Sequence, residues 1–184
     1  MGADLAARLR EAIRDVPDFP KPGVLFRDIT TLLLRPDLVR EAIHALWEPF
    51  AAERVTHIAG LEARGFILGT ALAVDRHLPL VLMRKPGKLP GARFGEEYRL
   101  EYGSAGLEVH RDALGPGDRV LIVDDVLATG GTAAAAGRLA AQCGADVVGY
   151  AFLAEIEILE GRRQLGSVPA VSLLLYGAEP ISGS

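Results

Sequence analysis

Short apolar stretches rich in β-branched residues alternate with stretches of helical character along this chain. Such apolar stretches are typical of β-strands, and they lie at residues 55–61, 80–84, 120–123, 147–153 and 168–176. Residues 65–76 carry a helical pattern between the first two strands, and the alanine-rich residues 131–143 carry another after the third. This alternation predicts an α/β fold with a central, mostly parallel sheet that helices flank on both faces.

Two further helical patterns precede or interrupt this series. Near the amino terminus the apolar residues at helical spacing are Leu5, Leu9, Ala12, Ile13 and Val16. A second apolar helix face carries Ile43, Leu46, Trp47 and Phe50, which we expect to pack in the core or against another subunit. The amino-terminal pattern includes acids and arginines, unlike a signal peptide. No apolar run approaches the length that spans a membrane, so we expect no membrane partner.

Composition narrows the classes of protein further. The chain has 184 residues, 49% of them hydrophobic and 24% charged, which suits a single domain over residues 1–184. A formal net charge of -4 leaves no overall basic surface, so nucleic acid is not an expected partner. The only cysteine, Cys143, allows no intrachain disulfide and no cysteine-rich metal site. These features favour a cytoplasmic protein.

The strand at residues 120–123 leads into two acids, Asp124 and Asp125, and then into a turn of small residues at 128–132. Backbone N–H groups in such a turn, with the positive end of the following helix, can bind a phosphate group. The two acids then lie where sugar hydroxyls would lie. An ordinary buried strand with an acidic turn explains the apolar residues, but not paired acids followed by Thr-Gly-Gly-Thr. The pattern therefore predicts a sugar-phosphate site.

Basic residues follow two of the other predicted strands. Arg64 comes after residues 55–61, where it can bind an anion or pair with Glu62 or another surface acid. Residues 84–103 mix lysines and arginines with glycines and prolines, as expected either of a mobile cationic lid or of a solvated hairpin. Because ligands bind beyond the carboxyl ends of parallel strands, we expect the loops after Leu61, Arg84 and Val123 to converge on one site.

Residues 120–132 resemble the phosphoribosyl-diphosphate (PRPP) signature of type I phosphoribosyltransferases. Residues 19–30, 62–66, 84–91 and 100–103 resemble, in the same order, the adenine phosphoribosyltransferase family. The resemblance implies the type I fold, with an amino-terminal base-binding hood at about residues 1–35 and a flexible lid at about 84–103. It also implies an enzyme of purine salvage that transfers the phosphoribosyl group from PRPP to adenine, giving AMP and pyrophosphate.

The resemblance assigns a role to each motif residue. The residues implied to bind the 5'-phosphate and ribose of PRPP or AMP are Asp124, Asp125, Ala128, Thr129, Gly130, Gly131 and Thr132. Those implied to hold pyrophosphate are Arg64, Lys85 and Lys88. Those implied to bind adenine are Leu25, Phe26, Arg27 and Val126, although core packing is the better explanation of the Phe26 side chain taken by itself. Catalysis would use Arg64, Lys85 and Glu101, with Glu101 exchanging a proton with the purine and Tyr102 supporting the closed lid.

The family further implies Mg²⁺, a hard cation that suits a diphosphate. We expect no direct protein ligand to this metal, with Asp124 and Asp125 acting through water. A homodimer is expected by the same resemblance. Pro86 and the charged residues 93–97 depart from the commoner family pattern, which leaves open which cation reaches the diphosphate. Two alternatives also stay open: a PRPP-binding regulatory domain without turnover, and a transferase for another purine base.

Overall fold

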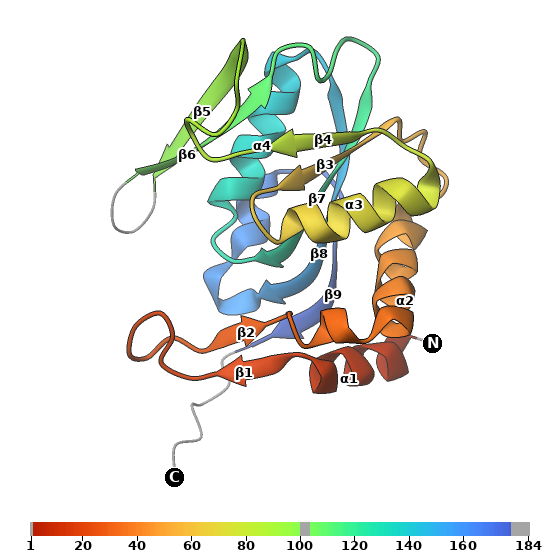
Figure 1. The fold of residues 1–184 in the computed structure, drawn as a ribbon, viewed down its shortest axis with the longest axis vertical. Coiled ribbons are helices and arrows are strands. Elements are labelled where there is room, and N and C mark those ends of the chain that lie inside the picture. The colour runs from red at the N-terminus through yellow and green to blue at the C-terminus, as the bar shows by residue number, and fades with distance from the viewer. Residues whose placement is uncertain (1, 100–103, 178–184) are drawn as a thin grey trace.

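The computed structural model describes residues 2–99 and 104–177. Its centre is a sheet of five parallel strands in the order β4-β3-β7-β8-β9 (Figure 1). In that order the strands are β4 (Leu80–Met83), β3 (His57–Leu61), β7 (Arg119–Leu127), β8 (Asp146–Ile156) and β9 (Ala170–Tyr176). The predicted parallel sheet is therefore confirmed. Glu101 and Tyr102, to which the family resemblance assigns proton exchange and lid support, lie outside the described residues.

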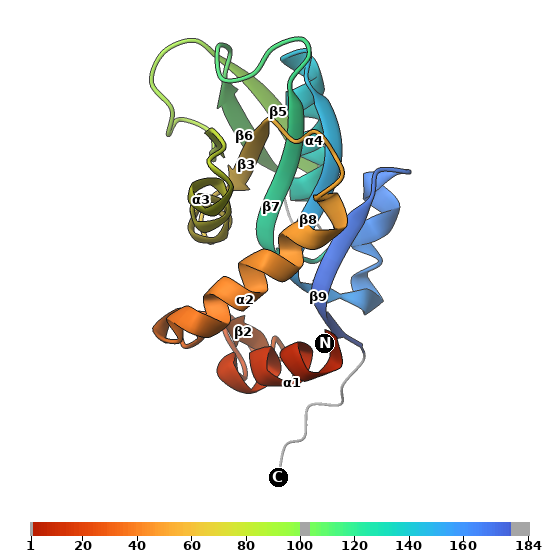
Figure 2. The same cartoon turned by 90° about the vertical axis from the view of Figure 1, so that its right-hand side faces the viewer.

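Helices cover both faces of the sheet, as predicted. The α-helices are α1 (Gly2–Ala12), α2 (Pro36–Trp47), α3 (Gly65–Arg76) and α4 (Gly131–Gln142). Alternate residues of β7 serve two separate cores, because successive strand side chains point to opposite faces. Leu121 and Val123 belong to the core formed with α1, α2 and α3. Val120 and Ile122 belong to the core formed with α4, and Figure 2 shows α3 and α4 on opposite sides of the strands.

A hairpin of two antiparallel strands packs beside α4 (Figure 1). It consists of β5 (Arg93–Arg99), within residues 84–103 that were predicted to be a lid or a solvated hairpin, and β6 (Ser104–His110), which follows that segment. Leu107 and Val109 are buried in the same core as α4, so one face of the hairpin is covered rather than solvated. The hairpin is thus a packed part of the fold, and its motion as a lid stays a prediction.

The amino-terminal segment forms a second, smaller antiparallel pair, β1 (Arg14–Val16) with β2 (Phe26–Asp28). The helix predicted from the apolar spacing up to Val16 is therefore wrong beyond Ala12, because Val16 pairs with Phe26 in a β-strand. Short 3₁₀ helices complete the elements: η1 (Leu32–Leu34), η2 (Glu48–Phe50), η3 (Glu157–Leu159) and η4 (Gly161–Leu165). Across residues 2–99 and 104–177, none of the helices combines the length and apolar character that a bilayer crossing needs.

Candidate active site

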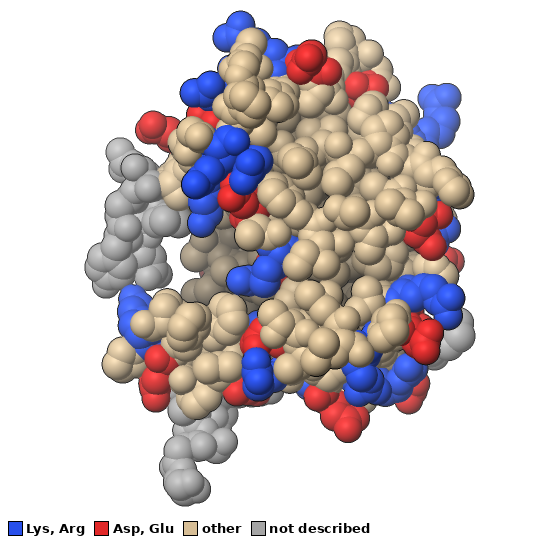
Figure 3. All heavy atoms as spheres, viewed as in Figure 1, with Lys and Arg blue, Asp and Glu red and all other residues tan. Residues whose placement is uncertain are grey.

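A pocket of about 570 Å³ opens at the carboxyl ends of the parallel strands. Lys and Arg side chains border a hollow in the space-filling view (Figure 3). The predicted site residues that line the pocket are Leu25, Phe26, Arg27, Arg64, Lys85, Asp124, Asp125, Val126, Ala128 and Thr132. The loops after Leu61, Arg84 and Val123 therefore converge on one site, as the sheet topology predicts.

The predicted phosphate loop borders a small recess of about 60 Å³ beside this pocket. Thr129 and Gly130 line the recess, while Gly131 lines neither cavity. Gly130 precedes α4 with a φ of +83°, and a Cβ there would lie 2.3 Å from the carbonyl oxygen of Gly161. Glycine is thus required for both conformation and space. Thr129 is exposed, so solutes can reach the loop, and the first N–H groups of α4 lack intrahelical acceptors.

The two acids of the motif have different surroundings. Asp125 is buried and forms an ion pair with Nε of Arg64. Asp124 lies partly exposed in the pocket, and its Oδ1 accepts a hydrogen bond of 2.9 Å from the backbone N–H of Asp125. Although the residue is partly exposed, the protein atoms packed around its carboxyl group desolvate it and raise the pKa of Asp124 well above its usual range, and the charge of Asp125 raises the pKa further. A ligand that supplies positive charge or hydroxyl donors would therefore stabilise the ionised form of Asp124.

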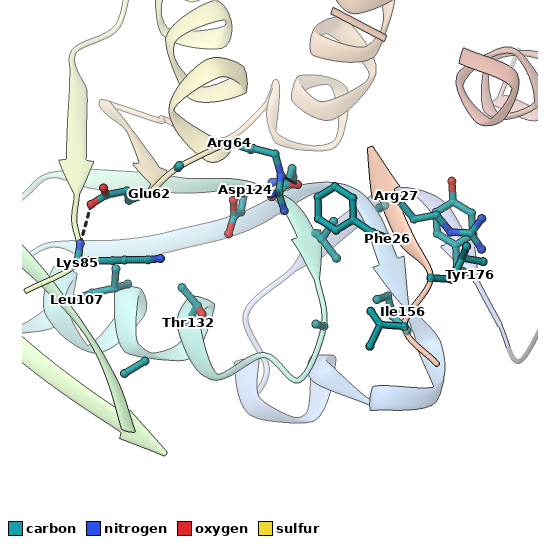
Figure 4. A pocket seen from close by; sticks show the side chains of 18 of the residues that line it. Phe26, Arg27, Glu62, Arg64, Lys85, Leu107, Asp124, Thr132, Ile156 and Tyr176 are labelled. Atoms are coloured by element: carbon teal, nitrogen blue, oxygen red, sulfur yellow. Dashed lines mark hydrogen bonds and ion pairs between the residues drawn. The ribbon is translucent and has the colours of Figure 1, made fainter. Parts of the chain in front are cut away.

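Arg64 reaches across the site rather than to its sequence neighbour. Its guanidinium pairs with Asp125 and lies 5.2 Å from the centre of the Phe26 ring, so it joins the acidic and aromatic parts of the pocket (Figure 4). The pairing with Glu62 considered from sequence is wrong. Glu62 instead accepts hydrogen bonds from the Lys85 backbone N–H at 2.9 Å and from Arg84 at 3.3 Å. The Lys85 hydrogen bond is the main cause that lowers the pKa of Glu62.

The two lysines of the cationic segment differ in position. Lys85 lines the pocket, and its side chain points inward (Figure 4). Lys88 is exposed and lines neither of the two cavities described above, while its carbonyl oxygen accepts a hydrogen bond from Arg84. Between them, Pro86 packs closely on β6, because a Cβ on Gly106 would lie 2.9 Å from its ring. Of these two lysines, Lys85 is therefore the one that lines the site, and the role of Lys88 stays a prediction.

An aromatic and aliphatic region occupies the other end of the pocket. The Phe26 ring packs edge-on against Phe19, with 5.2 Å between ring centres, and Ile156 points into the same region (Figure 4). Arg27 forms an ion pair with Asp15, and its guanidinium lies 4.0 Å from the centre of the Tyr176 ring. A flat apolar ligand could contact Phe26 there while polar groups at the wall read its edge.

Several lining residues were not predicted from sequence. Tyr98, Ala105 and Leu107 come from the hairpin, whereas Ile156 and Tyr176 end strands β8 and β9. The rule that ligands bind at the carboxyl ends of parallel strands could have found the last two. No local signal marks the hairpin residues, because the packing of the hairpin on α4 brings them to the pocket.

Comparison with known proteins agrees with this geometry. The phosphoribosyl transferase domain family matches residues 28–164. An adenine phosphoribosyltransferase of Methylococcus capsulatus is 56% identical over 169 residues, which cover 92% of this chain and 99% of that protein. One from Anaeromyxobacter dehalogenans strain 2CP-1 is 54% identical over 168 residues, covering 91% of this chain and 98% of that protein.

Solved structures show the same similarity in three dimensions. The adenine phosphoribosyltransferase of Rhodothermus marinus superposes with a TM-score of 0.91 at 51% identity, covering 95% of this chain and 99% of that one. The Saccharomyces cerevisiae enzyme, solved with an imino-altritol bisphosphate and adenine, has a TM-score of 0.88 at 41% identity, covering 94% and 99%. The chain therefore belongs to the phosphoribosyltransferase family and, within it, to the adenine phosphoribosyltransferases.

Proposed function

We propose that this protein transfers the 5-phosphoribosyl group of PRPP to adenine, producing AMP and pyrophosphate. The observation that carries the proposal is a main pocket with an adjoining recess, where the phosphate loop, paired acids, inward cations and an aromatic region meet. Each part matches one part of the two substrates. A sugar phosphate alone would not require the apolar region around Phe26, and a purine alone would not require the cations.

The phosphate loop and the acids would hold the ribose 5-phosphate half of PRPP. The residues proposed to bind the 5'-phosphate are Ala128, Thr129, Gly130, Gly131 and Thr132. Asp124 and Asp125 would bind the ribose hydroxyls, which donate to carboxylate oxygens. As pyrophosphate leaves, positive charge develops on the ribose, and an ionised Asp124 nearby would stabilise that charge. The raised pKa of Asp124 is consistent with a carboxyl group that needs such a partner.

Arg64 and Lys85 would bind the diphosphate, which gains negative charge as it leaves. Asp125 engages Nε of Arg64, and a guanidinium carries two further NH₂ groups that can donate to phosphate oxygens. Glu62 holds the backbone at Lys85, which would set the direction from which its ammonium approaches. Exposed Lys88 would be a weaker contributor. Both ends of the bond that breaks would thus be bound by fixed groups before reaction.

The residues fit a Mg²⁺ ion that arrives with PRPP. Asp124 presents a carboxyl group to the pocket, but no cluster of three or more His, Cys, Asp or Glu side chains suited to a metal occurs within residues 2–99 and 104–177. The diphosphate and water would therefore supply most of the ligands, with Asp124 and Asp125 binding through water. When bound, Mg²⁺ would neutralise charge on the leaving diphosphate.

Adenine would lie against Phe26 and Val126, with its edge read by Leu25 backbone groups and by Arg27. Since adenine loses a proton when its ring nitrogen attacks, a base is required. The sequence match assigns this role to Glu101 and support of the closed lid to Tyr102. Glu96, a nearby alternative acid, is engaged elsewhere, because its carboxylate binds Arg138 and Gln142 on α4. This arrangement supports Glu101 over Glu96.

We also propose a homodimer and a cytoplasmic location, both inferred from the family. Apolar side chains on α3 and β4 support the dimer, since Val74 is 70% exposed and Ile67 and Leu82 are at least 40% exposed. Analytical ultracentrifugation would test the dimer, and a monomer at micromolar concentration would contradict it.

The decisive experiment mixes purified protein with PRPP, Mg²⁺ and each of adenine, hypoxanthine, guanine and orotate. We expect AMP and pyrophosphate with adenine and little product with the other bases. Turnover with a different purine would overturn the assignment of adenine. PRPP binding without product from any base would instead indicate a regulatory domain.

A further inference from the structure

Tyr98 connects the hairpin to the phosphate loop. It lies near the end of β5, lines the main pocket, and its hydroxyl oxygen lies 3.0 Å from Oγ1 of Thr132. Thr132 is the second residue of α4 and lines both the pocket and the adjoining recess. Tyr98 therefore contacts a residue proposed to bind the 5'-phosphate, although it does not belong to the phosphate motif.

A second contact holds β5 against α4. Glu96 accepts hydrogen bonds from Arg138 at 2.5 Å and from Gln142 at 2.9 Å, both on α4. Residues two apart on a strand point to the same face, so Glu96 and Tyr98 both face this helix, beside which β5 runs (Figure 1). The position of Tyr98 thus has support besides its own hydrogen bond, and loss of its hydroxyl alone should leave the hairpin in place.

The two hydroxyls can exchange the roles of donor and acceptor. Each has one proton to donate and two lone pairs to accept, and the structure has Thr132 donating to Tyr98. A phosphate dianion only accepts, so Thr132 must turn its proton toward the phosphate when that group binds. Tyr98 can then donate its own proton to Oγ1 of Thr132. A chain of hydrogen bonds from tyrosine through threonine to phosphate strengthens each member.

We propose that Tyr98 is a positioning residue for the 5'-phosphate and that it acts through the hydroxyl of Thr132. The inference rests on the proposed function, because it takes Thr132 as a phosphate ligand. It adds a specific contribution of the hairpin to binding of the phosphoribosyl group. Tyr98 should affect ligands that carry the phosphate, PRPP and AMP, and should not affect adenine alone.

A double-mutant cycle with Tyr98→Phe and Thr132→Val tests this role. By calorimetry, we expect Tyr98→Phe to weaken AMP binding about threefold to tenfold, the range for one hydrogen bond. The affinity for adenine alone and the melting temperature should stay near the wild-type values. In the Thr132→Val background, Tyr98→Phe should not weaken AMP binding further. In the Thr132→Ser background, where the hydroxyl is kept, Tyr98→Phe should again weaken AMP binding.

Tyr150→Phe is the matched control. It removes the same group from a tyrosine on β8 that lines neither the main pocket nor the recess, so AMP binding should not change. In steady-state assays Tyr98→Phe should raise KM for PRPP more than it lowers kcat. Additive effects in the cycle, or an equal loss for adenine and AMP, would overturn the role of Tyr98.

Failure of the proposed function and failure of the Tyr98 role would give different results in these assays. Wild-type protein that binds AMP in this cycle but yields no AMP from adenine and PRPP would refute turnover and leave the Tyr98 result interpretable. Wild-type protein that turns adenine over, with AMP affinity unaltered by Tyr98→Phe, would refute only the role of Tyr98.

Discussion

Gly161 lies far from the phosphate loop in sequence but next to it in space, so a methyl group added at Gly161 should displace the loop. The Cβ of Gly161→Ala would lie 2.2 Å from the carbonyl oxygen of Ala128 and 3.0 Å from the backbone nitrogen of Gly130. Ordinary carbon–oxygen contacts begin near ~3.3 Å. The two backbone segments must therefore separate by about 1 Å, and Ala128 and Gly130 both belong to the proposed phosphate site.

The turn that carries Gly161 cannot easily yield instead. Its neighbour Arg162 donates from Nε to both carboxylate oxygens of the buried Glu155 at 2.8 Å. Overpacking of this kind costs about 1–3 kcal/mol, and each kcal/mol lowers the melting temperature by roughly 2–4 °C in a chain of this size. A misplacement of about 1 Å at a reacting group can cost ~100-fold in rate. We expect kcat/KM for PRPP to fall by about that factor.

The assay compares Gly161→Ala with Gly115→Ala by thermal melting and by initial rates at varied PRPP. Gly115 is the matched control, since a Cβ there meets no heavy atom within 4 Å and its φ is not positive. Gly161 has no positive φ either, so backbone conformation would not explain a difference. If Gly161→Ala, like Gly115→Ala, keeps the melting temperature and the kcat/KM for PRPP of the wild type, the close packing at Gly161 does not hold the phosphate loop in place.

Three other substitutions probe the acids and cations of the site. Asp124→Asn should abolish most turnover and stabilise the fold more at pH 8 than at pH 5. The pKa of Asp124 is higher in the folded protein than the value of 3.8 expected in the unfolded chain. Ionisation of Asp124 therefore reduces folding stability as the pH rises above 3.8, and the asparagine variant avoids this loss. A difference in melting temperature that does not depend on pH would contradict this. Arg64→Lys keeps the charge but loses the planar fork, so inhibition by pyrophosphate should weaken at least about tenfold, and unchanged inhibition would argue against contact with the diphosphate. Glu101→Gln should slow transfer about 100-fold with PRPP binding intact, and unchanged turnover would remove Glu101 from proton exchange.

Helices and strands were largely predictable because the signals that specify them are local. The bounds of α3 match the predicted residues 65–76, and α4 ends one residue before the predicted 143. Apolar β-branched runs also marked all five strands of the sheet. The location of the site followed as well, since parallel strands bring their carboxyl ends to one edge. Periodicity failed at Val16, where pairing with β2 outweighed the helical pattern.

Contacts between distant segments were not predictable in the same way. The sequence of the hairpin at residues 93–110 carries no sign that Glu96 binds α4 or that Tyr98 reaches Thr132. Likewise, the sequence offered Glu62 or another surface acid as an alternative partner of Arg64, while the fold pairs Arg64 with the buried Asp125. Spacing and residue type decide which elements form and which motif binds phosphate, because hydrogen bonding and burial repeat within each element. Which cation meets which acid, and which glycine has no room for a methyl group, depends on how those elements pack against one another, and only the assembled chain decides that.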